Sequence, residues 1–202
     1  MGTRVICHID LNTFFVRCEE IKNPRLIGKP VAIGSEGRCG IVSTSSYEAR
    51  KFGVKSGMPM YKAKELCPQL IILPVDFKFY DKKSKEFFSY VKRFTKRFEI
   101  GSCDECYADF TSVVKGKTNP RKFFEDFQQG LLKETNLKCS IGIAPTRFLA
   151  KMGSDMKKPL GITVIHRKDS VEMLSPLPIE DFFGIGKKTS PRLRNIGIET
   201  IG

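Results

Sequence analysis

The sequence lacks the long apolar segments that mark membrane and secreted proteins. No apolar run approaches the ~20 residues that span a bilayer. The first residues, MGTRVICHIDLN, have neither the apolar core nor the small-residue cleavage site of a signal peptide. Internal repeats and low-complexity segments are also missing. We therefore expect a globular, cytoplasmic protein with no membrane partner.

Cysteine is present in a number that does not suit a disulfide framework. The seven cysteines would leave one thiol unpaired, and a chain of 202 residues can bury a core without disulfides. Cys103 and Cys106 have the CxxC spacing of zinc and redox sites. No second CxxC accompanies them, so a zinc site is not favoured. We expect reduced thiols.

Acidic residues are few beside the basic ones. The chain has 35 Lys and Arg against 22 Asp and Glu, a net charge of +13. The excess is +5 over residues 1–75, +7 over residues 76–165 and +1 over residues 166–202, so it is not a detachable basic tail. Because 41% of the residues are hydrophobic, the chain is not a disordered polyelectrolyte. A broad basic surface on a folded protein predicts a polyanionic partner, most commonly nucleic acid.

Hydrophobic patterning predicts strands and helices that do not alternate regularly. We expect strands at residues 4–10, 30–33, 41–44, 70–73, 139–144 and 162–165, and a strand or hairpin at 100–111. We expect helices around residues 14–18, at 47–51, after Pro59, at 76–98, from 118–120 onward, and at 145–156. Asn12 or Thr13 could cap the first of these helices. This mixture predicts the α+β class.

Three carboxylates interrupt apolar strands. Asp10 ends the first strand, and Asp104 and Glu105 break the segment at 100–111. A buried carboxylate is costly unless a cation or hydrogen bonds compensate it. Three such groups could hold two Mg²⁺ ions around a triphosphate. Two plainer alternatives remain open, because a strand-end Asp is commonly a turn residue and adjacent acidic residues are commonly solvated. His8, on the strand face of Asp10, could be a base but is more commonly a packed residue.

A Ser/Thr-rich loop opens the helix expected at residues 47–51. Residues 40–54 read GIVSTSSYEARKFGV, and such a loop offers hydroxyls and backbone N–H groups to a phosphate. Tyr47 and Arg50 are three residues apart and therefore share a helix face. From these residues alone, a capped surface helix with an exposed arginine is the favoured alternative.

Six stretches together resemble the Y-family, DinB-type translesion DNA polymerases. They follow the order and spacing of that family over nearly all 202 residues: 5–20 (VICHIDLNTFFVRCEE), 40–57 (GIVSTSSYEARKFGVKSG), 74–80 (PVDFKFY), 102–109 (SCDECYAD), 140–158 (SIGIAPTRFLAKMGSDMKK) and 177–202 (LPIEDFFGIGKKTSPRLRNIGIETIG). Small departures occur at Cys103, Cys106 and Gly153, where the family more often has an aliphatic residue, Ala and Ala.

The resemblance implies roles for particular residues. Asp10, Asp104 and Glu105 match the carboxylates that hold two Mg²⁺ ions, and the carbonyl of Leu11 would complete one coordination sphere. Phe15 matches a steric gate against the ribose 2′-OH. The remaining matches are Thr44, Tyr47, Arg50 and Lys158 for the incoming triphosphate, Ser43 over the nascent base pair, and Gly184, Gly186 and Lys187 for a helix-hairpin-helix turn on a DNA phosphate.

The resemblance also implies a domain plan and a reaction. Residues 1–11 and 76–165 would form a palm, a mixed sheet backed by two long helices; residues 12–75 would form the fingers, and residues 166–202 the start of a helical thumb. The expected enzyme is a monomeric, low-fidelity DNA polymerase that adds dNMP from a dNTP to a primer 3′-OH in DNA damage tolerance and repair. Its partners would be primer–template DNA and dNTP. A little-finger domain and a sliding-clamp motif would lie beyond residue 202. The alternatives are a DNA-binding fragment without activity and another two-metal palm enzyme, such as a nucleotide cyclase.

Overall fold

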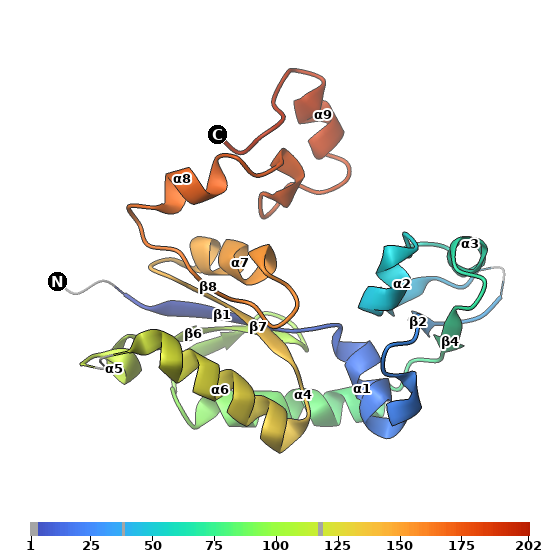
Figure 1. Cartoon of the computed structure of the whole chain (residues 1–202), viewed down its shortest axis with the longest axis horizontal. Coiled ribbons are helices and arrows are strands. Elements are labelled where there is room, and N and C mark those ends of the chain that lie inside the picture. The colour runs from blue at the N-terminus through green and yellow to red at the C-terminus, as the bar shows by residue number, and fades with distance from the viewer. Residues whose placement is uncertain (1–3, 38, 117–118) are drawn as a thin grey trace. The chain divides into compact units, whose positions relative to one another are not determined.

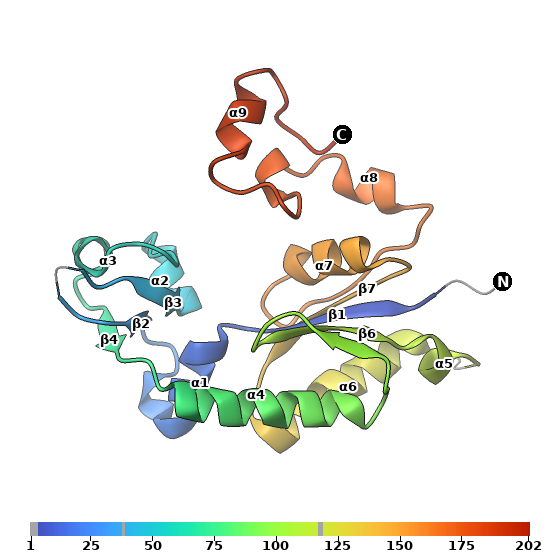
Figure 2. The same ribbon diagram turned by 180° about the vertical axis from the view of Figure 1, so that it is seen from behind.

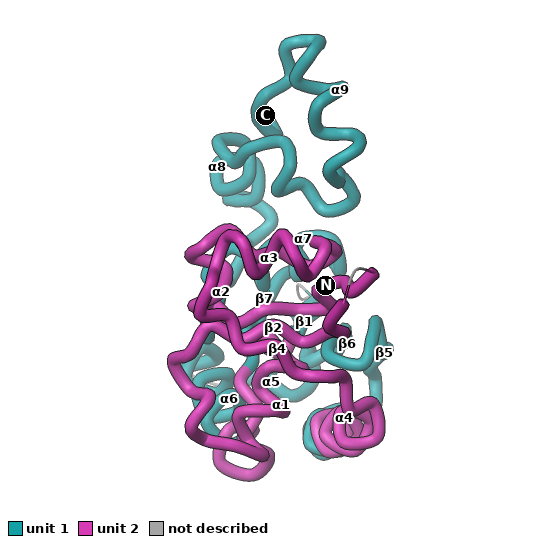
Figure 3. Tube along the Cα trace, turned by 90° about the vertical axis from the view of Figure 1, so that its right-hand side faces the viewer, with its two compact units in different colours: residues 1–10, 90–130, 139–202 teal, residues 11–89, 131–138 magenta. Residues whose placement is uncertain are grey.

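The chain divides into two compact units. The structure, a computed structural model, describes residues 4–37, 39–116 and 119–202. One unit comprises residues 1–10, 90–130 and 139–202, and the second comprises residues 11–89 and 131–138 (Figure 3). No helix within the described ranges is long and apolar enough to cross a membrane.

The first unit is built on a mixed sheet. Among the described residues its strands follow the order β5-β6-β1-β7-β8, with bounds Phe98–Ile100, Glu105–Asp109, Ile6–Leu11, Cys139–Ala144 and Ile162–Val164. β1 and β5 pair antiparallel to β6, whereas β7 and β8 are parallel. β7 is buried at every position, which explains why its sequence, CSIGIA, is made of small and apolar residues and has no alternating charged positions.

Helices pack on both faces of this sheet. Helix α7 (Arg147–Met156) lies on one face, and the first part of α6 (Pro120–Thr135) lies on the other (Figures 1 and 2). Beneath the sheet, the rings of Phe94 and Phe127 are 4.9 Å apart, and the Tyr90 hydroxyl donates a 2.9 Å hydrogen bond to the Phe127 carbonyl. These aromatic contacts join the segment after residue 89 to α6.

A glycine sets how closely α7 approaches the sheet. A Cβ placed on Gly142 of β7 would lie 1.9 Å from the Ala150 carbonyl oxygen and 2.4 Å from the Ser154 nitrogen. The helix backbone therefore rests directly on the strand backbone. This close packing determines the height of every α7 side chain above the sheet.

The second unit contains a small sheet and short helices. Its strands follow the order β3-β2-β4, with bounds Val42–Ser45, Val31–Gly34 and Ile71–Leu73. Its helices are α1 (Phe14–Lys22), η1 (Pro24–Leu26), α2 (Tyr47–Lys51), α3 (Met60–Leu66) and most of α4 (Phe77–Lys92). The Ser46 hydroxyl oxygen caps α2 by accepting from the Ala49 N–H and also accepts from the Val31 N–H. One side chain thus joins β2 to the start of α2.

The remaining elements of the first unit are short. They are α5 (Thr111–Val114), α8 (Ser170–Leu174), η2 (Ile179–Asp181) and α9 (Ser190–Arg194). Phe182 packs on Phe148 of α7 with ring centroids 5.0 Å apart, and the Phe183 N–H donates to the Met152 sulfur.

The α+β class is confirmed, and two local predictions are wrong. The helix expected at 76–98 ends at Lys92, because the Thr95 hydroxyl donates to the Asp109 carbonyl and accepts from the Arg97 N–H, which turns the chain into β5. Thr13 occupies the N-cap position of α1 in a left-handed conformation, and its side chain makes no capping hydrogen bond. The predicted start of α6 at residues 118–120 includes Thr118, which lies outside the described residues.

Candidate active site

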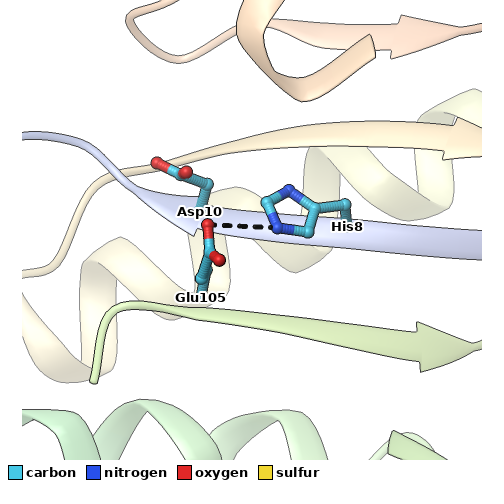
Figure 4. A group of neighbouring side chains, drawn as sticks. All are labelled: His8, Asp10 and Glu105. Atoms are coloured by element: carbon cyan, nitrogen blue, oxygen red, sulfur yellow. Dashed lines mark ion pairs between the residues drawn. The ribbon is translucent and has the colours of Figure 1, made fainter. Parts of the chain in front are cut away.

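Two carboxylates meet where β1 ends and β6 begins. Asp10 and Glu105 are register partners in the antiparallel β1–β6 ladder. One ligand atom from each of His8, Asp10 and Glu105 lies within 4.8 Å of the others, and the group includes neither Cys103 nor Cys106 (Figure 4). Asp10 is 8% exposed, so its charge is largely removed from water. The site is therefore an acidic cluster of the kind that binds a cation.

Asp104 lies one residue before β6, in the turn of the β5–β6 hairpin. The Ser102 hydroxyl donates a hydrogen bond to its carboxylate. Burial raises the pKa of Asp104, and the negative charges of Asp10 and Glu105 raise it further. A hairpin turn is the geometry that an adjacent Asp–Glu pair needs, since two neighbours within one straight strand would face opposite ways.

Two ammonium groups lie among these carboxylates. Lys151 of α7 places Nζ 2.9 Å from Glu105 Oε2 and 3.3 Å from Asp10 Oδ2. Lys158 places Nζ 2.7 Å from Asp10 Oδ1 and 2.8 Å from Asp155 Oδ1. Burial lowers the pKa of both lysines, but the neighbouring carboxylates outweigh it and leave both pKa values raised. Both lysines are therefore charged at neutral pH.

Glu105 is held strongly ionised. Its pKa is lowered to about 2, first by His8 and then, against the opposing effect of burial, by Lys151. A carboxylate that stays ionised under these conditions is a ready oxygen ligand for a divalent cation.

The predicted nucleotide-binding residues other than Lys158 belong to the second unit. Phe15 stacks on Tyr80 with ring centroids 4.4 Å apart and meets Phe77 edge-on, so its ring is fixed on α1. Tyr47 and Arg50 share one face of α2 as expected, with the guanidinium carbon 5.0 Å from the ring centroid. Three further predicted residues in this unit are Leu11, which is buried, Ser43, which is exposed, and Thr44, which is half-buried. Their roles stay predictions.

The predicted helix-hairpin-helix turn precedes α9. Gly184 has a φ of +101°, a conformation that favours glycine, and the Ile185 N–H donates to the Phe182 carbonyl. Gly186 and Lys187 are both exposed. The turn thus presents backbone and an ammonium group to solvent.

The comparisons with known proteins agree with this geometry. The impB/mucB/samB family matches residues 9–155, well over half of the chain. The chain belongs to the impB/mucB/samB family. The family's own helix-hairpin-helix motif matches residues 172–198 and so includes the turn before α9.

Among curated members of this group, the chain is 47% identical to DNA polymerase IV of Bacillus velezensis over 201 residues, which are 98% of this chain and 48% of that relative. It is 45% identical to DNA polymerase IV 1 of Bacillus subtilis over 202 residues, 99% of this chain and 49% of that one. The chain thus spans about half the length of the curated relatives it matches.

Solved structures place the fold in the same family. The crystal structure of DinB from Sulfolobus solfataricus superposes with a TM-score of 0.90 and 33% identity, covering 97% of this chain and 58% of that one. An insertion ternary complex of Dbh DNA polymerase superposes with a TM-score of 0.88 at the same identity and coverage. The resemblance to DinB-type Y-family polymerases is confirmed.

Sequence reasoning missed several residues of the cluster. Lys151, Ser154 and Asp155 lie on α7 inside the matched stretch 140–158, yet a helical segment rich in charge gives no sign of which charges point at the sheet. His8 is buried and packs against Tyr107, as expected of a packed histidine, and strand alternation correctly puts it on the Asp10 face; its place beside Glu105 could not be predicted.

Proposed function

We propose that this chain is the catalytic core of a DNA-directed DNA polymerase that transfers dNMP from a dNTP to a primer 3′-OH and releases pyrophosphate. The observation that carries the proposal is the pairing of Asp10 with Glu105 across β1 and β6, next to Asp104, in a chain of the impB/mucB/samB family. The relatives named DNA polymerase IV support it. Low-fidelity synthesis past damaged bases, and hence a role in damage tolerance, is the finer part of the proposal.

The donor set suits Mg²⁺. Asp10, Asp104 and Glu105 offer hard carboxylate oxygens, and Asp10 and Glu105 already hold two ammonium groups within 3.3 Å. Two bound Mg²⁺ ions would polarise the phosphoryl group and stabilise the charge on the attacking and leaving oxygens. Leu11 would add its carbonyl to one coordination sphere.

The chain's own residues would bind and orient the nucleotide. Lys158 would exchange its ion pair with Asp10 for a triphosphate oxygen, joined by Thr44, Tyr47 and Arg50. The ring of Phe15, fixed by its stack on Tyr80, would exclude a ribose 2′-OH. Catalysis would then rest on positioning and charge neutralisation.

The thumb segment would add contacts to the DNA backbone. Gly184, Gly186 and Lys187 would contact a phosphate, but residues 166–202 have a net charge of only +1. We therefore expect DNA binding by this chain to be modest and to weaken steeply with salt.

Primer extension with Mg²⁺ and the four dNTPs tests the proposal. Asp104→Asn and Glu105→Gln, which keep side-chain size and remove the charge, should abolish extension while DNA binding measured by anisotropy persists. Asp81→Asn, an exposed acid paired with Lys85 on α4, is the matched control and should extend as the wild type does. Extension by the two carboxylate variants at the wild-type rate would refute the metal assignment. DNA binding without any wild-type extension would identify a binding fragment without activity of its own.

The steric gate has a separate test. Phe15→Ala should raise incorporation of ribonucleotides relative to deoxynucleotides, because the ring no longer crowds the 2′-OH. An unchanged ratio would contradict the role of Phe15 and leave the metal assignment intact.

A further inference from the structure

His8 is the most deeply buried polar side chain of the cluster. It is 0% exposed, and it lies on β1 two residues before Asp10, on the same strand face. Its Nε2 is 3.3 Å from Glu105 Oε2, at ion-pair distance, and has no well-formed hydrogen bond to any described residue (Figure 4). A buried ring nitrogen is therefore directed at the carboxylate.

The other ring nitrogen is held by α7. Nδ1 of His8 is 2.8 Å from the Ser154 hydroxyl oxygen, which also lies 2.8 Å from the Lys151 carbonyl oxygen. Because an ionised carboxylate can only accept, the contact with Glu105 requires the ring hydrogen on Nε2, and Nδ1 then accepts from the Ser154 hydroxyl. The ring also packs against Tyr107 with centroids 4.6 Å apart. The imidazole thus has a fixed plane and a fixed direction.

Glu105 Oε2 is contacted from two sides. Lys151 Nζ approaches it at 2.9 Å and His8 Nε2 at 3.3 Å. The two contacts differ in kind, since Lys151 is a long and partly exposed side chain whereas His8 is enclosed. A divalent cation entering the cluster can displace the ammonium group but cannot displace the buried ring.

We propose that His8 is a positioning residue, which Ser154 fixes in orientation and which holds the Glu105 carboxylate toward the cation after Lys151 has moved away. The inference rests on the proposed function, because it assumes that Glu105 is a metal ligand. Groups behind a metal ligand orient it, and their loss commonly weakens metal binding by about 10–100-fold.

Mn²⁺ binding to the 202-residue chain, followed by the electron paramagnetic resonance signal of free Mn²⁺, tests this without requiring polymerase activity. His8→Phe keeps the ring and its packing but loses both polar contacts, and should weaken Mn²⁺ binding by about tenfold or more. His8→Gln should restore most of the affinity, because its longer amide can donate to Glu105. His8→Asn should not restore the Mn²⁺ affinity, because its shorter amide reaches only toward Ser154.

Controls separate this inference from the proposed function. Ser154→Ala should weaken Mn²⁺ binding less than His8→Phe does, since the ring stays packed but loses its anchor. Thermal unfolding in chelator checks folding; if His8→Phe does not fold, the comparison of His8→Gln with His8→Asn decides. Equal affinity of wild type and His8→Phe, or of the Gln and Asn variants, would overturn the inference alone. Direct nitrogen coupling in the Mn²⁺ spectrum would also overturn it, by making His8 a ligand. Absence of Mn²⁺ binding by the wild type would refute the proposed metal site and the inference with it.

Discussion

Gly142 is one of the described glycines of the first unit that alanine should not be able to replace. In Gly142→Ala the new methyl group would lie 1.9 Å from the Ala150 carbonyl oxygen and 2.4 Å from the Ser154 nitrogen. Both are backbone atoms of α7, so the clash cannot be relieved by a change of side-chain rotamer. The whole helix would have to move outward by more than about 1 Å. Overpacking of this kind costs about 3 kcal/mol at the upper end of its usual range.

Gly153, on the α7 side of the contact between α7 and β7, provides the matched control substitution. A Cβ at Gly153 would lie 3.4 Å from the Gly142 Cα and 3.4 Å from Ile165 Cδ1, which are ordinary van der Waals distances. Since alanine is favoured over glycine inside a helix by about 1 kcal/mol, Gly153→Ala should be neutral or slightly stabilising.

Thermal unfolding followed by circular dichroism at 222 nm distinguishes the two variants. For a chain of this size about 1 kcal/mol shifts Tm by 2–4 °C, so Gly142→Ala should lower Tm by about 6–12 °C, and Gly153→Ala should leave it unchanged or raise it by up to about 4 °C. Gly142→Ala should also weaken Mn²⁺ binding, because a displaced α7 moves Ser154 away from His8. Equal Tm values for the two variants would refute the argument that backbone contact sets the height of α7.

The remaining predictions concern charge and capping. Lys151→Met removes the ammonium group that competes for Asp10 and Glu105, so it should bind Mn²⁺ several-fold more tightly than the wild type while unfolding at a lower temperature in chelator; weaker binding would contradict this. Glu105 has a folded-state pKa of about 2, below its unfolded value of 4.5, so the stability it contributes is complete above pH 4.5 and is lost as the pH falls toward 2. Urea unfolding at pH 6, 4 and 3 should therefore show a shallower acid dependence in Glu105→Gln than in the wild type, and parallel curves would contradict the shift. Ser46→Ala leaves the Val31 and Ala49 N–H groups without their acceptor and should cost about 2 kcal/mol, measured by urea unfolding, whereas Ser43→Ala at an exposed position should cost little.

Most strands and helices could be predicted from the sequence, because their hydrophobic pattern and capping residues lie within the element itself or next to it. β7 is buried at each position and its bounds match those expected from its sequence, and α2 follows from a capping serine before it and Gly53 after it. The end of α4 could not be predicted in this way. The aromatic spacing continues past Lys92, and the turn depends on Thr95 meeting the Asp109 carbonyl, which is a contact with a strand 14 residues away.

The residues of the candidate site also differ in whether local sequence could predict them. Asp10, Asp104 and Glu105 could be predicted because carboxylates that interrupt apolar strands are conspicuous in sequence. Lys151 could not be predicted as part of the site, because its place beside Glu105 depends on the close approach of α7 to β7. The sequence around Lys151 contains no signal for that approach. The division into palm, fingers and thumb, and the roles of the predicted nucleotide- and DNA-binding residues, stay predictions.

The two lysines also bear on how the protein is made. Clustered carboxylates would repel one another during folding, yet Asp10 and Glu105 of the cluster, and Asp155 beside it, each have an ammonium group within 3.6 Å. We therefore expect the chain to fold without a dissolved cation, since its own ammonium groups offset much of the negative charge at the sheet edge. A newly synthesised molecule would mature first and acquire metal afterwards, by exchanging one positive group for another. Chelators should accordingly strip it of metal and leave it folded, in contrast to small domains whose folding free energy comes from a bound ion.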